Sequence, residues 1–151
     1  MGKKSKKSNK LPLKQTAVQP NNDNRIRLSN GSTSERLIFN FSFLSSNYDI
    51  STIEKSTYKK LLDKIVQLSQ IESMPVLLAM PKASGIEKME KSSFKKEVGL
   101  PKNFTNSPRM TMVGDDYWVI RLSQQIRMIG KMTDTLFYVV AIDEKHEVYP
   151  G

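Results

Sequence analysis

The chain lacks cysteine altogether and has a single histidine among its 151 residues. Without cysteine there can be no disulfide bridge, no thiolate catalysis and no cysteine-ligated zinc. One histidine, His146, cannot supply a histidine-rich metal site either. Long apolar runs are also missing, since the longest, PVLLAM and YVVAI, fall far short of a membrane-spanning segment. The sequence therefore predicts no metal, no cofactor and no membrane association.

Acidic residues are scarce as well: 15 Asp and Glu stand against 24 Lys and Arg, a net charge of +9. Such an excess favours acidic partners, nucleic acid among them. The N-terminal lysines are not followed by the apolar stretch of a secretory signal, so we expect a cytoplasmic protein.

Most of the excess charge lies near the N-terminus, which leaves the rest of the chain nearly neutral. Residues 1–33 are too polar to form a core, so we expect a disordered tail followed by one domain over residues 34–151. Two interpretations of the tail stay open: a solubilising leader, or an arm that binds RNA phosphates. In the second case the binding side chains are Lys3, Lys4, Lys6, Lys7, Lys10, Lys14, Arg25 and Arg27.

The domain begins with LIFNFSF, residues 37–43, whose alternation predicts a strand. Residues 51–70 predict a helix with Ser51 and Glu54 as a capping box. Its expected core face consists of Tyr58, Leu61, Leu62, Ile65 and Leu68. PVLLAM is interpreted as a short strand or an extended crossing. SGIEKMEKSSFKKEVG predicts a second helix, because Ser84 and Glu87 repeat the capping spacing.

Three strands are expected to close the domain as an antiparallel meander. The last of them is TLFYVVAID, rich in β-branched and aromatic residues, and the turn MTDT joins it to the strand before. The order strand, helix, second helix, meander predicts an α+β fold with helices on one face of a curled sheet.

The stretch YWVIRLSQQIRMIGK predicts a β-hairpin with the three-residue loop 123–125. This register places Leu122 opposite Ile126 and Arg121 opposite Arg127. One face is then a core face: Trp118, Ile120, Leu122, Ile126 and Met128. The other face collects Tyr117, Val119, Arg121, Arg127, Ile129 and Lys131. Like charges directly across a strand pair destabilise it, so the facing arginines need an explanation.

Two explanations stay open. A bound phosphate would relieve the repulsion, because the planar guanidinium matches phosphate oxygens with paired hydrogen bonds. Alternatively, the arginines pair with carboxylates nearby in sequence: Asp115, Asp116, Asp143 and Glu144. Under the first explanation the cationic surface extends to Lys131, and to Lys102 and Arg109 in the preceding loop.

Two side chains after the last strand are candidates for proton transfer. His146 titrates near neutral pH and could act as a general acid or base, or it is an exposed histidine without a task. Tyr149 could stack on a base or share in the proton transfer.

The segment DDYWVIRLSQQIRMIGKMTDTLFYVVAIDEKHE resembles the C-terminal half of RelE/HigB-like bacterial toxins. In those proteins a strand with an Arg leads through a polar turn into a second strand with an Arg. A third apolar strand then ends near an Asp and a His. Here the matching parts are Arg121, residues 123–125, Arg127, and VVAID with His146. The ending also resembles small prophage and mobile-element proteins of unknown role.

The resemblance implies a RelE-like fold and a metal-independent mRNA endoribonuclease that acts at the ribosome, with an antitoxin protein as a partner. The 2′-hydroxyl of the RNA would attack the adjacent phosphate, with Arg121, Arg127, His146 and Tyr149 as the catalytic side chains. Two other classes stay open: a non-catalytic basic protein that binds RNA or the ribosome, and an interaction module of a prophage or mobile element.

Overall fold

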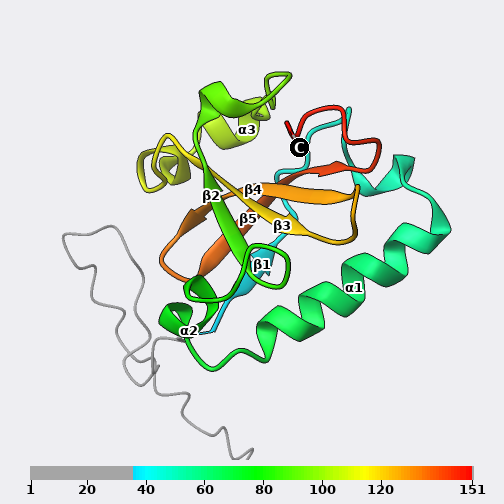
Figure 1. Cartoon of the computed structure of the whole chain (residues 1–151). Helices are drawn as coiled ribbons and strands as arrows, with labels where there is room; N and C mark the ends of the chain where they lie inside the picture. The colour runs from blue at the N-terminus through cyan, green and yellow to red at the C-terminus, as the bar shows by residue number, and fades with distance from the viewer. Residues whose placement is uncertain (1–35, 151) are drawn as a thin grey trace, which may run out of the picture. The chain divides into compact units, whose positions relative to one another are not determined.

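The computed structural model describes residues 36–150, and within this range three α-helices accompany a five-stranded sheet (Figure 1). The predicted α+β class is confirmed. The predicted tail, residues 1–33, lies outside the described residues, together with all eight of its basic side chains. Among residues 36–150, no helix has the length and apolar character that crossing a lipid bilayer requires.

The sheet has the strand order β1-β5-β4-β3-β2. Its strands are β1 (Ile38–Asn40), β2 (Ile86–Met89), β3 (Tyr117–Arg121), β4 (Arg127–Thr133) and β5 (Leu136–Asp143). The last three form the predicted antiparallel meander. The first strand is shorter than the predicted 37–43 and pairs with β5 in parallel, so the sheet is mixed.

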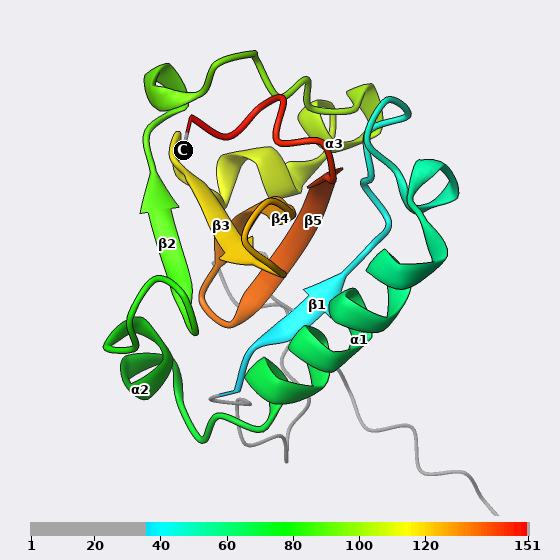
Figure 2. The same ribbon diagram turned by 45° about the vertical axis from the view of Figure 1, so that its right-hand side comes forward.

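Both faces of the sheet are covered, which corrects the expectation of helices on one face only. Adjacent residues of β5 point to opposite sides: Phe137 belongs to the cluster beneath α1, whereas Tyr138 packs with Phe104 of α3. Figures 1 and 2 show α1 (Lys55–Ser69) and α3 (Lys102–Thr105) on opposite sides of the sheet. The second face is therefore not a free surface.

The helix α1 starts later than predicted, and it is capped from another part of the chain. Ser51 lies in the 3-10 helix η1 (Ile50–Thr52), so it does not form the predicted capping box. Instead, Glu144, just after β5, accepts hydrogen bonds from the backbone N–H of Glu54 and from the hydroxyl of Thr57. A carboxylate at this position satisfies a free N–H group and interacts favourably with the helix dipole.

The middle of the chain differs most from expectation. PVLLAM was predicted to be extended, but Met74–Leu78 form the short helix α2 with Pro75 in its first turn. The stretch predicted to be a second helix contains the strand β2 and the 3-10 helix η2 (Lys91–Ser93) instead. A further 3-10 helix, η3, covers Pro108–Thr111. Because β2 pairs with β3, this correction brings Glu87 next to the hairpin.

Candidate functional site

The hairpin has the predicted register. Arg121 lies opposite Arg127, and the backbone N–H of Leu122 donates to the carbonyl of Ile126 at 3.0 Å. Ser123 stabilises the turn, since its hydroxyl accepts hydrogen bonds from the backbone N–H groups of Gln125 and Ile126. The predicted core face packs beneath α1 as expected, although Trp118 is only partly buried. The two arginines therefore do meet on the other face.

That face is not an open cationic surface, which corrects the sequence-based expectation. Residues 94–100 and the C-terminal segment 144–150 cover it, and the apolar side chains of both pack against it. In Figure 1 the C-terminal segment, in red, turns back sharply after the end of β5. Arg127 and Lys131 are consequently only 3% and 2% exposed.

Lys131 has a structural role rather than the predicted RNA-binding one. Its Nζ donates to three backbone carbonyls, those of Gly114 at 3.1 Å, Asp115 at 2.6 Å and Asp116 at 3.1 Å. It also lies 4.0 Å from the centre of the Tyr117 ring. Burial lowers the pKa of this ammonium, but three carbonyl acceptors satisfy its three hydrogens. The side chain ties the loop before β3 to the centre of the sheet.

We expect Lys131→Met to lower stability by about 1–3 kcal/mol, because three part-buried carbonyls would lose a charged donor. Lys88→Met is the matched control, since Lys88 forms an exposed ion pair with Asp116 and its loss should cost at most about 1 kcal/mol. Urea unfolding of the three proteins measures the difference. Equal stability of the Lys131→Met variant and the wild type would contradict the structural role.

Tyr149 is the centre of the cluster that does form on this face. Its hydroxyl donates to the carboxylate of Glu87 at 3.0 Å and accepts from the guanidinium of Arg121 at 3.2 Å. The guanidinium of Arg127 lies over its ring, 4.6 Å from the centroid. The ring of His146 meets it edge-on at 5.4 Å. The other three predicted catalytic residues are therefore brought together around the buried side chain of Tyr149.

Glu87 supplies the negative charge of the cluster. Its carboxylate accepts from Nζ of Lys82 at 2.6 Å and lies 3.9 Å from the guanidinium of Arg121. Burial by itself would raise the pKa of Glu87, but the hydrogen bonds from Lys82 and Tyr149 and the nearby positive charges outweigh burial and lower it. Glu87 thus stays ionised at neutral pH and partly compensates the two arginines.

Arg127 is the more deeply buried of the two arginines. Burial, followed by the charge of Arg121, lowers its pKa, yet a guanidinium remains protonated at neutral pH. One of its terminal nitrogens donates to the carbonyls of Ser123 at 2.8 Å and Ile126 at 3.1 Å. The Nε atoms of Arg121 and Arg127 are buried and lack a hydrogen-bond partner among the described residues. Arg127 is thus packed against the Tyr149 ring and presents almost no surface to a ligand.

His146 lies at the rim of the cluster, partly exposed and with a positive φ of 58°. Its Nδ1 is 2.8 Å from the carbonyl oxygen of Gln125 in the hairpin turn. A carbonyl oxygen can only accept, so Nδ1 carries the hydrogen of this contact. The turn of the hairpin thereby fixes the orientation of the imidazole.

Asp143 holds the C-terminal segment in place. Its two carboxylate oxygens accept from the backbone N–H groups of Glu147 at 2.8 Å, Val148 at 2.9 Å and Tyr149 at 2.9 Å. The alternative in which the arginines pair with carboxylates nearby in sequence is not observed among the described residues. Among the described residues, Asp143 binds this segment, Glu144 caps α1, Asp116 pairs with Lys88, and the carboxylate beside Arg121 belongs to Glu87 on β2.

Two other predicted RNA-binding residues do not join the cluster. Lys102 is exposed at the start of α3, and the guanidinium of Arg109 lies over the ring of Phe43 at 5.3 Å. Conversely, sequence reasoning missed Glu87, because it assigned residues 84–99 to a helix, and it therefore also missed Lys82, which binds that carboxylate. The stretch Ile86–Met89 reads IEKM and does not alternate, so no periodicity in the sequence could have revealed the strand.

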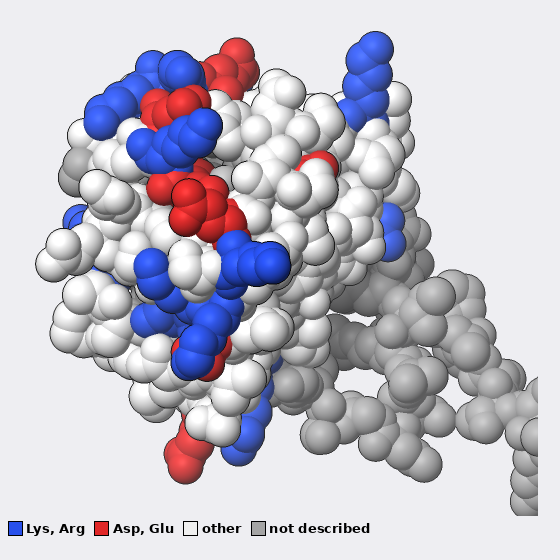
Figure 3. Space-filling view, turned by 90° about the vertical axis from the view of Figure 1, so that its right-hand side faces the viewer, with Lys and Arg blue, Asp and Glu red and all other residues white. Residues whose placement is uncertain are grey.

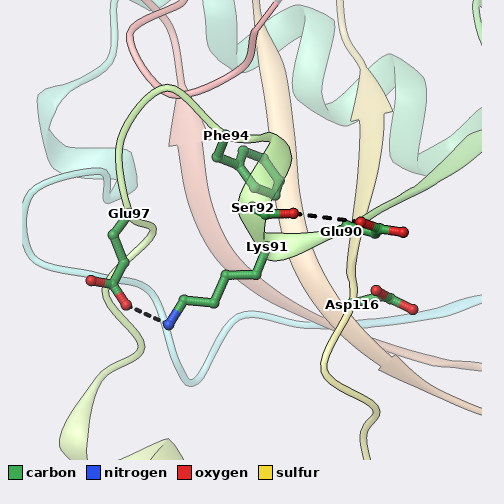
Figure 4. Close-up of a pocket in the computed structure, with 6 residues that line it drawn as sticks. All are labelled: Glu90, Lys91, Ser92, Phe94, Glu97 and Asp116. Atoms are coloured by element: carbon green, nitrogen blue, oxygen red, sulfur yellow. Dashed lines mark hydrogen bonds and ion pairs between the residues drawn. The ribbon is translucent and has the colours of Figure 1, made fainter.

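Two surface pockets formed by the described residues are lined by none of the side chains of this cluster. An open one of about 630 Å³ is lined by Glu90, Lys91, Ser92, Phe94, Glu97 and Asp116 (Figure 4). Three of these six residues are acidic, and the one lysine is paired with Glu97 at 2.6 Å, so this pocket does not suit a phosphate. On the face seen in Figure 3, basic and acidic side chains lie side by side in a central column rather than forming an unbroken basic patch.

Within residues 36–150, no group of three or more His, Cys, Asp and Glu side chains is arranged to hold a metal ion. No family model, no curated protein and no solved structure matches the chain. What the cluster around Tyr149 does must therefore be argued from its own chemistry.

Proposed function

We propose that the protein is a RelE-like, metal-independent endoribonuclease that cleaves mRNA at the ribosome in the cytoplasm. The observation that carries the proposal is the arrangement around Tyr149. There the two arginines, the histidine and the tyrosine expected for such chemistry meet at the end of one hairpin. The antiparallel meander of β3, β4 and β5 is the part of the fold on which the resemblance rests.

The exposed members of the cluster are suited to bind the scissile phosphate. Arg121 and Lys82 retain 32% and 68% side-chain exposure, and both carry their charge next to Glu87. As the 2′-oxygen attacks, negative charge builds up on the phosphate oxygens, and these cations stabilise it. Tyr149 and Glu87 act through Arg121 by holding its guanidinium, so they are positioning residues.

His146 performs the proton transfer in this proposal. The 2′-oxygen forms a bond to phosphorus while its proton moves to Nε2 of His146. The bond between phosphorus and the 5′-oxygen breaks, and the 5′-oxygen takes up a proton from His146 or from solvent. The products are a 2′,3′-cyclic phosphate and a 5′-hydroxyl, and no metal enters the reaction.

A second candidate is an interaction module of a mobile element in which the arginines are structural. The burial of Tyr149 and Arg127 favours it, because neither side chain can contact RNA unless the C-terminal segment moves. In that case an antitoxin or another protein, rather than RNA, would be the partner.

Induced expression followed by mapping of RNA 5′ ends distinguishes the two candidates. We expect new 5′-hydroxyl ends within translated mRNA for the wild type and a loss of these ends for Arg121→Ala. Arg109→Ala is the matched control, because Arg109 is an exposed arginine outside the cluster. If the wild type produces no new ends, the endoribonuclease proposal is wrong. If Arg109→Ala removes the ends as well, the cluster is not the site.

A further inference from the structure

The helix α1 carries an apolar stripe that no other part of residues 36–150 covers. Tyr58, Leu62 and Val66 follow one another at intervals of four residues and therefore lie on one line along the helix. Leu62 is 60% and Val66 55% exposed, although Leu62 was predicted to be a core residue. The core contacts of α1 are made by the neighbouring line of Thr57, Leu61, Ile65 and Leu68. The exposed stripe, Tyr58, Leu62 and Val66, lies beside this core line.

We propose that the apolar stripe is the contact between two copies of this chain, which pack their α1 helices antiparallel about a two-fold axis at Leu62. Both Tyr58 and Val66 lie four residues from Leu62. The axis therefore brings Tyr58 of one copy against Val66 of the second, while the two Leu62 side chains meet. A surface of this kind is self-complementary, as two-fold interfaces must be.

The charges beside the stripe fit the same arrangement. Lys59 and Asp63 lie on one flank of the stripe and form an exposed ion pair at 2.6 Å within the helix. In a symmetric antiparallel pair, the same flanks of both helices face each other. Lys59 of one copy then comes next to Asp63 of the second. The ion pair can therefore form between the two helices as well as within each of them. Like charges do not meet on this flank.

The size of the stripe limits the strength of the contact. Three apolar side chains bury less area than the roughly 800 Å² per partner of a standard stable interface. We therefore expect a weak dimer with a dissociation constant in the range of about 10 µM to 1 mM. The proposal is independent of the proposed ribonuclease activity, since the stripe and the Tyr149 cluster share no residue.

Sedimentation velocity of the full chain over this concentration range tests the proposal. We expect a concentration-dependent dimer, and Leu62→Glu should weaken it at least about tenfold by placing two carboxylates at the axis. Val76→Glu is the matched control, because Val76 is 51% exposed on α2 and lies outside the stripe. Either a chain that stays monomeric throughout or a dimer that survives Leu62→Glu overturns the proposal. In the first case the stripe would belong to another partner.

The absence of cysteine allows a second measurement that reports geometry. Leu62→Cys introduces a single thiol at the proposed axis, where the two copies come close enough for a disulfide. Under mild oxidation we expect a covalent dimer to form at least about tenfold faster than with Val76→Cys, because the noncovalent dimer raises the effective thiol concentration. Equal rates for the two variants would place the contact elsewhere and overturn the proposal.

Discussion

Asp143→Ala is expected to lower the free energy of unfolding by about 3 kcal/mol, the largest stability effect of any single substitution that we predict. Asp143 is 1% exposed and accepts three backbone hydrogen bonds from the C-terminal segment. Alanine would leave the buried N–H groups of Val148 and Tyr149, and the part-buried one of Glu147, without an acceptor. Each unsatisfied N–H group would cost about 1–3 kcal/mol. The segment can instead detach from the sheet, so that water satisfies these groups. The cost of detachment therefore limits the total loss of stability.

Thermal unfolding measures this effect as a fall in Tm of about 10 °C for a domain of this size. Asp116→Ala serves as the control, because Asp116 pairs with Lys88 on the surface and its loss should cost at most about 1 kcal/mol. Limited proteolysis adds a local measurement, since a detached segment exposes the peptide bond after Lys145. An unchanged Tm for Asp143→Ala would mean that the segment is held by its apolar contacts alone.

The hairpin could be predicted from sequence because all its determinants are local. Alternation fixes which residues share a face, and the three-residue loop fixes which residues are opposite. The pairing of Arg121 with Arg127 follows from these two facts. What covers the second face could not be predicted, because it depends on a segment that turns back after β5 and is held there by Asp143.

The strand β2 shows the opposite case. It has four residues, and its partner β3 lies about 30 residues further along the chain. The spacing of Ser84 and Glu87 fits a helix cap equally well, so local reasoning preferred the helix. The pairing with β3 decides the outcome, and tertiary pairing commonly overrides local preference in short segments. This one error concealed the acidic member of the Tyr149 cluster.

On α1, periodicity predicted a helix correctly but not the direction of its core face. Five apolar residues span a wider arc than the sheet can cover, so the core takes Leu61, Ile65 and Leu68 while Leu62 stays exposed. Thr57, a polar residue, is buried because Glu144 binds its hydroxyl. Both results depend on where the end of β5 lies relative to the helix. The sequence of the helix alone does not contain this information.

His146→Asn is expected to slow RNA cleavage by about 10²- to 10⁴-fold, the range usually supplied by a general acid or base. Asparagine is chosen because it tolerates a positive φ, and its side-chain amide can donate to the carbonyl of Gln125 as Nδ1–H does. The variant therefore keeps the local structure but lacks a nitrogen that can accept a proton. Its Tm should stay close to that of the wild type, since the change lies at the surface.

The measurement is cleavage of a ribosome-bound mRNA by purified wild type, His146→Asn and Lys145→Asn. Lys145 is exposed and adjacent in sequence, so its variant tests whether any change in this segment affects cleavage. Cleavage by Lys145→Asn at the wild-type rate, together with the large loss in His146→Asn, assigns the proton transfer to the imidazole. If His146→Asn cleaves as fast as the wild type, His146 takes no part in the reaction. The arginines would then act on the phosphate without a histidine.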